Sequence, residues 1–395
     1  MTWAAYAVGM SDSAAPTVRT AVAGMIAMAV AVGIGRFVYT PILPPMSEAL
    51  HLSKTAAGTI ASANFCGYMA GALTLAFFPP AGSRRTWVFV ALAVSTMSTV
   101  AMGWDWGIGG FLALRFVGGF ASAVVLVWTS AIVMERLATS GRSALSAVHF
   151  AGVGAGIALS AAVVALLLAR GGDWAAMWHA SGALSAIGLA SVWMLLPRDR
   201  SAGGRPAVGN ARGASAAQVR MTVAYGLFGF GYVITATFLV AIVRGSPAAR
   251  PIEPIIWILV GLGAMPSVWL WSLLARRIGT ARAYATAAIA EAVGVLASVL
   301  WPGPAAIGIG AVLLGATFMG LTSLGLTRAR ELSAGDPGRA MAAMTGAFGF
   351  GQIVGPVFAG ALSDRLGGFL VPSAIAAAGL VLAAWLATWG DNRRA

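Results

Sequence analysis

Long apolar stretches separated by short polar segments follow one another along the chain. A helix needs about 20 apolar residues to cross the roughly 30 Å hydrocarbon core of a membrane, and these stretches reach that length. The pattern predicts twelve membrane-spanning helices, at residues 20–45, 56–78, 86–104, 108–134, 144–169, 174–196, 221–243, 255–275, 283–301, 305–327, 341–363 and 369–389.

A polar stretch at residues 197–218 divides the spans into two groups of six. It is rich in Gly, Ala, Ser and Arg and lacks a helical apolar period, which is typical of a flexible linker. The predicted fold is an all-α membrane protein with twelve transmembrane helices in two pseudo-symmetric six-helix bundles. We expect a tail at 1–19, an N-terminal bundle at 20–196, a linker at 197–220, a C-terminal bundle at 221–389 and a second tail at 390–395.

The two groups of spans resemble each other in sequence. Residues 33–44, GIGRFVYTPILP, align with residues 229–240, GFGYVITATFLV, at an offset of 196 positions. Two glycines and a leucine coincide, and Tyr232 occupies the position equivalent to Arg36. Together with the six-plus-six arrangement, this similarity predicts two parallel halves around a site near the middle of the membrane.

Charged residues are scarce and unevenly distributed. Asp, Glu, Lys and Arg make up 9% of the 395 residues, against roughly a quarter in soluble domains, so a soluble protein is excluded. If both termini are cytoplasmic, 18 of the 25 basic residues lie in cytoplasmic segments, five lie outside, and Arg36 and Arg115 fall within spans. Cytoplasmic loops are enriched in Lys and Arg, so we expect this orientation. It explains the net charge of +13 without a nucleic-acid partner.

Signals for secretion, catalysis and metal binding are lacking. Asp12 and Pro16 precede a first apolar run that exceeds a signal peptide's apolar core, so we expect this run to be retained as the first span. No Gly-x-x-x-x-Gly-Lys loop occurs, and no methionine cluster includes histidine or cysteine at ligand spacing. The single cysteine, Cys66, excludes a disulfide framework. We therefore expect neither an enzyme nor a bound cofactor or metal.

Five segments carry a resemblance to a known family. The most specific is GIGRFVYTPILPPM at 33–46, and the others are ASANFCGYMAGAL at 61–73, RFVGGFASA at 115–123, YGLFGFGYVITATFL at 225–239 and GQIVGPVFAGALSDRLGG at 352–368. The chain resembles the major facilitator superfamily, and more narrowly its YbfB/YjiJ-type family. The resemblance implies a transporter of the bacterial inner membrane, for which a monomer suffices. It also implies a central cavity lined by spans 1, 4, 7 and 10.

The cytoplasmic loops depart from the usual motif of this superfamily. The loop between spans 2 and 3 reads PPAGSRR at 79–85 and lacks the usual acidic residue. In the sister loop at 274–282, Arg276 stands where that aspartate would fall. The usual cytoplasmic salt bridge is therefore not supported, and we consider Glu135 with Arg136 and Arg142 as a replacement gate.

Arg36 and Arg115 lie inside spans 1 and 4, which line the central cavity according to the resemblance. An ionisable group within a bilayer is costly and needs a partner or a cavity. We predict that the two guanidinium groups give the cavity a positive potential suited to a carboxylate, a phosphate or another anion. The alternative for Arg36 is a structural anchor, bonded to backbone carbonyls that a bend at Gly33, Gly35 and Pro41 sets free.

Other polar side chains within the spans are candidates for proton coupling or substrate contact. For proton coupling they are His149, which titrates near physiological pH, Glu291, which lies deep in span 9, and Arg115, by resemblance. Hydrogen bonds between helices are the alternative for the first two. The uncharged candidates for substrate contact, which hydrogen bonding between helices explains equally well, are Tyr39, Asn64, Tyr232, Thr235 and Gln352.

The sequence thus predicts a secondary active transporter that moves a small polar organic solute by alternating access with proton coupling, an anion being favoured. One alternative is efflux of amphipathic compounds. It is disfavoured because Ile157 follows Gly156 where drug antiporters of this superfamily carry a proline. Another alternative is a non-transporting receptor or scaffold, which would show no solute flux in liposomes. The expected partners are the substrate, the lipid bilayer and protons.

Overall fold

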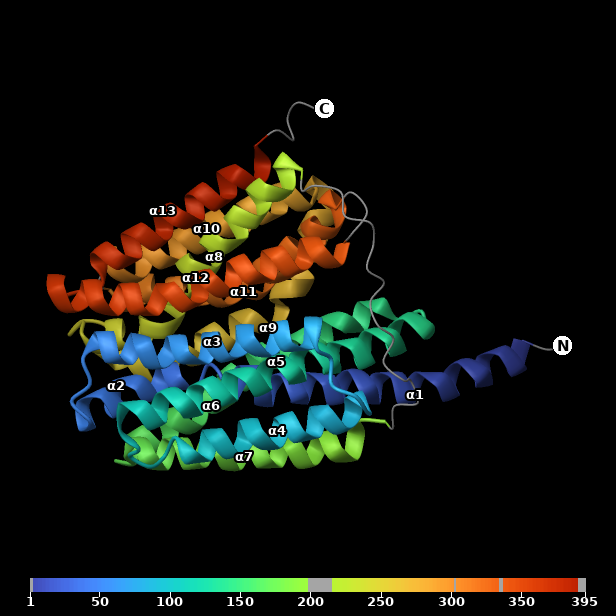
Figure 1. Cartoon of the computed structure of the whole chain (residues 1–395), viewed down its shortest axis with the longest axis horizontal. Helices are drawn as coiled ribbons and strands as arrows, with labels where there is room; N and C mark the ends of the chain where they lie inside the picture. The colour runs from blue at the N-terminus through green and yellow to red at the C-terminus, as the bar shows by residue number, and fades with distance from the viewer. Residues whose placement is uncertain (1–2, 198–214, 302, 334–336, 390–395) are drawn as a thin grey trace.

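The computed structural model describes residues 3–197, 215–301, 303–333 and 337–389, which are almost entirely helical (Figure 1). The N-terminal half contains α1 (Trp3–Met28), the π-helical turn η1 (Ala29–Ile34), α2 (Tyr39–Ala49), α3 (Lys54–Phe77), α4 (Arg84–Ala101), α5 (Gly107–Thr139), the short turn η2 (Ser143–Leu145), α6 (Ser146–Ala169) and α7 (Trp174–Leu195). The C-terminal half contains α8 (Ala216–Arg244), η3 (Arg250–Ile252), α9 (Glu253–Ile278), α10 (Thr280–Leu300), α11 (Pro304–Leu332), α12 (Pro337–Leu366) and α13 (Leu370–Thr388).

The predicted spans are found as helices. Eleven segments of the described chain are long and apolar enough to cross a membrane, and the first of them, Pro16–Ala49, joins the end of α1 to η1 and α2. The remaining predicted span is α4, which is shorter and less apolar because it starts with two arginines and carries five Ser and Thr residues. The all-α class with two six-helix bundles is therefore confirmed.

Helix boundaries follow local capping where a cap is present. α7 begins at Trp174, as predicted, because the Asp173 carboxylate accepts a hydrogen bond from the Ala176 amide at 2.8 Å. α8 begins at Ala216, before the predicted start at 221, and the Ser215 hydroxyl caps it. α1 begins at Trp3, inside the predicted tail. Most of the predicted linker (198–214) and the second tail lie outside the described residues.

Large apolar side chains cover the outside of the helices. Ile187, Trp193 and Met97 are at least 60% exposed. A soluble monomer rarely presents such a surface, whereas the acyl chains of a bilayer would cover it. The exposed surface and the spans agree in describing a multi-pass membrane protein.

Three polar contacts reveal the pseudo-symmetry of the two halves. The Thr40 hydroxyl donates to the carbonyl oxygen of Ala236 at 2.6 Å, and these two residues are equivalent in the predicted repeat, 196 positions apart. The same offset relates the pair Arg84–Glu135, at 3.0 Å, to the pair Thr280–Glu331, at 2.6 Å. The sequence repeat therefore corresponds to a structural repeat, and spans 1 and 7 meet close to its axis.

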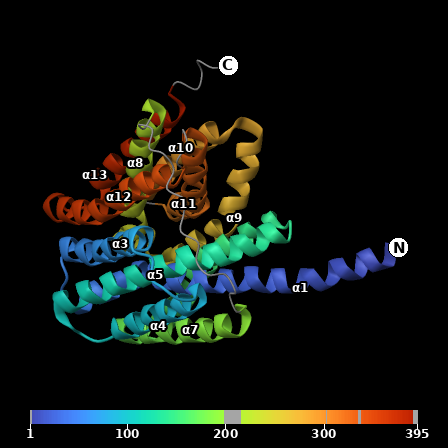
Figure 2. The ribbon, with the colours of Figure 1, turned by 45° about the vertical axis from the view of Figure 1, so that its right-hand side comes forward.

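The two halves touch on one side of the molecule and diverge toward the other, which holds both termini (Figures 1 and 2). We call these the far side and the termini side. On the far side, the Asp364 carboxylate of α12 accepts hydrogen bonds from the amides of Lys54 and Thr55, at 3.1 and 2.8 Å, and so caps α3 of the other half. Arg244 at the end of α8 pairs with Glu48 of α2 at 3.0 Å. Polar contacts between the halves thus hold the far side together.

Glycines allow the helices of the two halves to approach closely. A Cβ atom on Gly58 of α3 would overlap the backbone carbonyl of Pro356 in α12, and one on Gly360 would overlap the carbonyl of Lys54. The helices α6 and α9 form another close contact between the halves, where a Cβ on Gly154 would lie 2.5 Å from the carbonyl oxygen of Gly261. Small residues permit such backbone contact in membrane helices. The far side is therefore closely packed as well as bonded.

Candidate functional site

The first span is interrupted in its middle, and the interruption forms the candidate site. η1 has π-helical bonding, with the Gly35 amide donating to the Val30 carbonyl at 2.9 Å, and residues 35–38 form turns before α2 resumes. Pro41 has no amide proton, so it cannot donate to the carbonyl of Phe37 four residues earlier. The indole of Trp257, from α9 of the other half, donates to that carbonyl at 3.1 Å. The break is thus stabilised by the opposite half.

Arg115 of α5 stabilises the other side of the break. Its Nη1 and Nη2 atoms donate to the carbonyl oxygens of Gly35 and Arg36, each at 2.9 Å, and its guanidinium lies 5.0 Å from the centre of the Tyr39 ring. The Asn64 side chain donates to the Arg115 carbonyl at 2.9 Å and ties α3 to α5. Only 4% of Arg115 is exposed. The anchoring role considered for Arg36 therefore fits the contacts of Arg115.

Arg36 has a different environment at the same break. Its Nη2 lies 3.3 Å from the Ser122 hydroxyl, and its guanidinium stacks over Tyr68 at 4.0 Å from the ring centre, with Phe65 at 5.5 Å. It is 6% exposed, and its Nε has no hydrogen-bond partner. Within the part of the chain that the structure describes, no carboxylate lies within salt-bridge distance of Arg36. Its positive charge is buried among aromatic rings without a counter-charge.

Aromatic and amide side chains of the C-terminal half face this guanidinium. Tyr232 of α8 lies within electrostatic reach of Arg36 and accepts a short hydrogen bond from the Gln352 amide of α12. The Tyr232 ring is nearly parallel to the rings of Phe318 and Phe348, at centroid distances of 5.9 and 5.8 Å. The Oε1 atom of Gln352 has no partner. The predicted candidates Arg36, Tyr232 and Gln352 are therefore brought together across the two halves.

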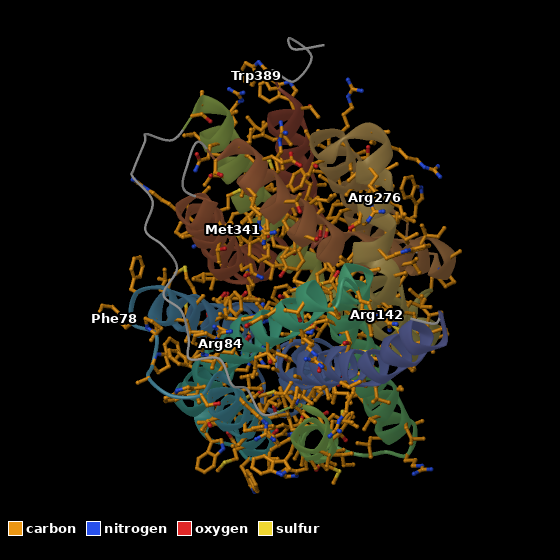
Figure 3. The ribbon with its side chains drawn as sticks, turned by 90° about the vertical axis from the view of Figure 1, so that its right-hand side faces the viewer. Phe78, Arg84, Arg142, Arg276, Met341 and Trp389 are labelled. Carbon is orange, nitrogen blue, oxygen red and sulfur yellow. The ribbon has the colours of Figure 1, made fainter. Side chains whose placement is uncertain are left out.

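The open space between the halves lies on the termini side, and Arg36, Tyr232 and Gln352 do not line it. Toward α9, the pocket lined by Phe37, Tyr232, Trp257 and Phe318 holds about 10 Å3, room for one water at most. On the termini side, a cleft of about 890 Å3 separates the halves, and its lining includes Met69, Phe78, Arg84, Trp128 and Met341. Figure 3 views this side and shows Phe78 and Arg84 on the N-terminal half and Met341 on the C-terminal half. A solute therefore has room on the termini side, while the far side is shut.

Comparison with known proteins decides the family. Residues 28–388 match the model of a family described as "Uncharacterised MFS-type transporter YbfB". The chain belongs to this family. A gallate transporter of Pseudomonas putida is 26% identical to this MFS-type transporter over 156 residues, 40% of this chain and 34% of that protein. The chain thus matches about a third of the length of that curated relative.

Solved structures of transporters share the fold. A mutant of the nucleoside transporter NupG superposes with a TM-score of 0.71 at 14% identity, covering 94% of this chain and 99% of that chain. A bacterial homologue of the human lysosomal transporter Spinster, in an inward-facing and unoccupied conformation, gives 0.70 at 14% identity, covering 94% and 96%. The family is one of MFS-type transporters, so this protein is a membrane transporter rather than an enzyme. The solved structures show that it shares their fold.

The other substrate candidates lie around the same break. The Tyr39 hydroxyl donates to the Ala57 carbonyl at 2.9 Å and links spans 1 and 2 of the transporter. The Thr235 hydroxyl is buried without a partner one helical turn from Tyr232, and the Oδ1 atom of Asn64 is likewise free. Substrate contact by Tyr39, Asn64 and Thr235 stays a prediction.

The two remaining proton-coupling candidates lie apart from each other. His149 of α6 is buried against α5, with its Nε2 atom 3.0 Å from the Ser130 hydroxyl, and its contacts are within the N-terminal half. Glu291 of α10 is fully buried in the C-terminal half and lies within electrostatic reach of Tyr232. Only Glu291 is therefore connected to the residues that face Arg36.

The residues predicted to form a cytoplasmic gate do not bridge the halves in this structure. Glu135 pairs with Arg84 of the same half, Arg136 is exposed, and Arg142 is exposed on the termini side (Figure 3). The physical reason is the separation of the halves at this end, where the cleft lies. A gate between these residues and the C-terminal half could form only in another conformation.

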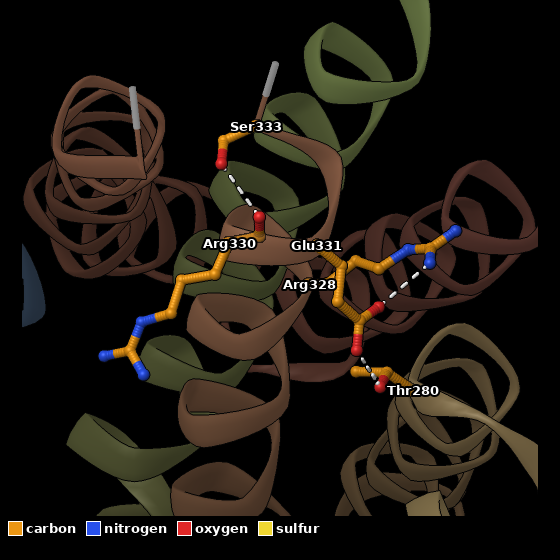
Figure 4. A network of polar contacts seen from close by, with 5 residues as sticks. All are labelled: Thr280, Arg328, Arg330, Glu331 and Ser333. Atoms are coloured by element: carbon orange, nitrogen blue, oxygen red, sulfur yellow. Dashed lines mark hydrogen bonds and ion pairs between the residues drawn. The ribbon is translucent and has the colours of Figure 1, made fainter. Parts of the chain in front are cut away.

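The C-terminal half contains a matching network on the termini side. Glu331 accepts a hydrogen bond from the Thr280 hydroxyl at 2.6 Å and pairs with Arg328 at 3.0 Å (Figure 4). Beside it, the Ser333 hydroxyl donates to the Arg330 carbonyl at 2.8 Å. Like the Arg84–Glu135 pair, the Thr280–Glu331 bond joins two helices of the same half.

Aromatic residues of the site escaped the sequence reasoning. Tyr68 lies under the Arg36 guanidinium, Phe318 and Phe348 are parallel to Tyr232, and Trp257 donates to the Phe37 carbonyl at the break. In the sequence, isolated aromatic residues in apolar spans cannot be distinguished from ordinary packing residues. One signal was available for Tyr68, because it lies in the segment at 61–73 that carries part of the family resemblance.

Proposed function

We propose that this transporter moves a small organic anion across the bacterial inner membrane by alternating access, with Arg36 as the anion-binding residue. The observation that carries the proposal is the unpaired charge of Arg36. Elsewhere in the described chain Arg84, Arg244 and Arg328 each contact a carboxylate. A buried charge without a partner is costly, and a substrate carboxylate would supply the partner with bidentate geometry.

The surroundings of Arg36 support an aromatic acid as the substrate. Tyr68 on one half, and the parallel rings of Tyr232 and Phe348 on the other, are aromatic surfaces on which a flat ring could stack once the halves move apart. The free Oε1 atom of Gln352 can accept a hydrogen bond from a ring hydroxyl. The partial match to a gallate transporter, a protein named for a hydroxylated aromatic acid, supports the same class. We therefore propose a hydroxybenzoate-like anion.

The direction of the cleft supports an inward-facing conformation. The basic residues favour a cytoplasmic termini side, because positive charge concentrates in cytoplasmic loops. With this orientation the cleft of about 890 Å3 opens to the cytoplasm and the contacts of Glu48, Arg244 and Asp364 close the outer side. Alternating access then requires these outer contacts to break while the termini side closes.

Counterflow in proteoliposomes tests the proposal. Vesicles loaded with unlabelled 4-hydroxybenzoate should take up the labelled compound, and Arg36→Gln should lower this uptake about 30-fold or more, as expected when one partner of a buried charge pair is removed. The matched control is Arg170→Gln, which removes the same charge from an exposed position outside the site and the gate. Uptake of lipophilic cations instead of anions would contradict the proposal and favour efflux of amphipathic compounds. Absence of flux for every solute class would favour a receptor.

A further inference from the structure

Glu291 is a carboxyl group buried in the middle of α10 without a charged partner among the described residues. It is 0% exposed, and neither of its oxygens has a hydrogen-bond partner. The hydroxyl of Thr317, on α11, lies beside the carboxyl and donates to the carbonyl oxygen of Leu313 at 2.6 Å. Neither Arg36 nor the aromatic residues around it need this carboxyl for their positions, so its presence in the span calls for another explanation.

Among the described residues, the groups that face Glu291 include no cation. α10 packs against α8, α9, α11 and α13. Two titratable side chains lie within electrostatic reach, Tyr232 from α8 and Tyr284 from α10 itself, and both are neutral phenols. α13 carries no titratable residue between its bounds.

The charged residues of the other neighbouring helices lie near the helix ends. They are Arg220 and Arg244 on α8, Glu253, Arg276 and Arg277 on α9, and Arg328, Arg330 and Glu331 on α11. Tyr225 of α8 is a further phenol on the packed elements. A deprotonated Glu291 would therefore be an unpaired negative charge in a low-dielectric interior, which is strongly unfavourable.

We infer that Glu291 is the proton-binding residue of this transporter and that it carries its proton in the conformation described. The inference rests on the proposed anion transport, which it deepens by naming the coupled ion and its site. When water reaches α10 in another state of the cycle, the O–H bond of the carboxyl breaks and the proton passes to water. Rebinding reverses this step, and no other reactant is consumed.

Tyr232 connects this carboxyl to the anion site. It lies within electrostatic reach of both Arg36 and Glu291. A negative charge on Glu291 would repel an anion bound to Arg36, whereas protonation removes that repulsion. Because such coupling is reciprocal, the anion and the proton favour each other's binding. One carboxyl provides one proton, so a monovalent acid should move with a single proton in an electroneutral symport.

Accumulation driven by a pH gradient tests this inference. Proteoliposomes with an alkaline interior should concentrate 4-hydroxybenzoate, and a membrane potential imposed with valinomycin and potassium should change the accumulation little. Glu291→Gln imitates the protonated carboxyl, so we expect it to keep counterflow but to lose roughly tenfold of the gradient-driven accumulation. Asp105→Asn is the matched control, an equivalent change at an exposed residue far from the site. Accumulation by Glu291→Gln equal to that of the unmodified protein would overturn the inference.

Infrared difference spectroscopy provides a readout that does not need a substrate. The purified protein should show the carbonyl band of a protonated carboxylic acid at neutral pH, and this band should be missing in Glu291→Gln and present in Asp105→Asn. Absence of the band from the unmodified protein would contradict the inference even if transport were observed. Absence of counterflow with the band present would instead reject anion transport and leave the protonated Glu291 established.

Discussion

The two sides of the break in span 1 use the same residue type for different purposes. On one side the terminal nitrogens of Arg115 donate hydrogen bonds to the carbonyl oxygens of Gly35 and Arg36. On the other side the Arg36 guanidinium contacts one hydroxyl, of Ser122, and the ring of Tyr68. The Nε atoms of both arginines lack a partner, so the difference lies in the terminal nitrogens. A buried guanidinium whose two terminal nitrogens donate to backbone carbonyls stabilises the fold, whereas one that contacts only a hydroxyl and a ring is available to a ligand. The comparison teaches that burial alone does not distinguish an anchor from a binding group.

The largest expected effect is the loss of stability in Arg115→Gln. This change removes two charge-assisted hydrogen bonds and leaves two buried carbonyls at the break, so the free energy of unfolding should fall by about 3 kcal/mol. Thermal unfolding of the purified protein in detergent measures it. Arg36→Gln is the matched comparison and should change stability by less than about 1 kcal/mol, because its charge has no partner to lose. Equal losses in the two variants would remove the distinction between the arginines.

A smaller effect is expected from Trp257→Phe. The Phe37 carbonyl would lose the indole donor that compensates for Pro41, at a cost of about 1 kcal/mol. Because this bond joins the halves, its loss should let the far side open more often. The rate at which a thiol reagent labels a cysteine introduced on the far side should therefore rise. Trp269→Phe is the control, since Trp269 is exposed on the outside of α9. An unchanged Trp257→Phe protein would show that the break does not depend on the opposite half.

The smallest effect is expected at Tyr68. Tyr68→Leu removes the ring beneath Arg36, and the lost cation–π interaction is worth about 0.5–2 kcal/mol. The dissociation constant for 4-hydroxybenzoate should rise in proportion, because the guanidinium would be held less firmly. Tyr68→Phe keeps the ring and should bind like the unmodified protein. Weaker binding by Tyr68→Phe would mean that the hydroxyl, rather than the ring, contacts the ligand.

The positions of the spans were predictable because each depends on local composition. α7 begins at Trp174 as predicted, since Asp173 caps it, and the repeat offset of 196 correctly paired Thr40 with Ala236. The division of roles between Arg36 and Arg115 was not predictable. It depends on the rotation of two helices about their axes and on which carbonyls the break releases, and neither is encoded in a local pattern. For the same reason the aromatic residues around Arg36 were not identified.

The most direct test of the account is a calorimetric titration with 4-hydroxybenzoate and with its neutral amide. The unmodified protein should bind the acid roughly 30-fold or more tightly than the amide, because only the acid neutralises Arg36. Arg36→Gln should bind the two compounds about equally, while Arg170→Gln, a change at an exposed arginine, should keep the full preference for the acid. An Arg36→Gln protein that still prefers the acid would contradict the assignment of Arg36 as the anion-binding residue.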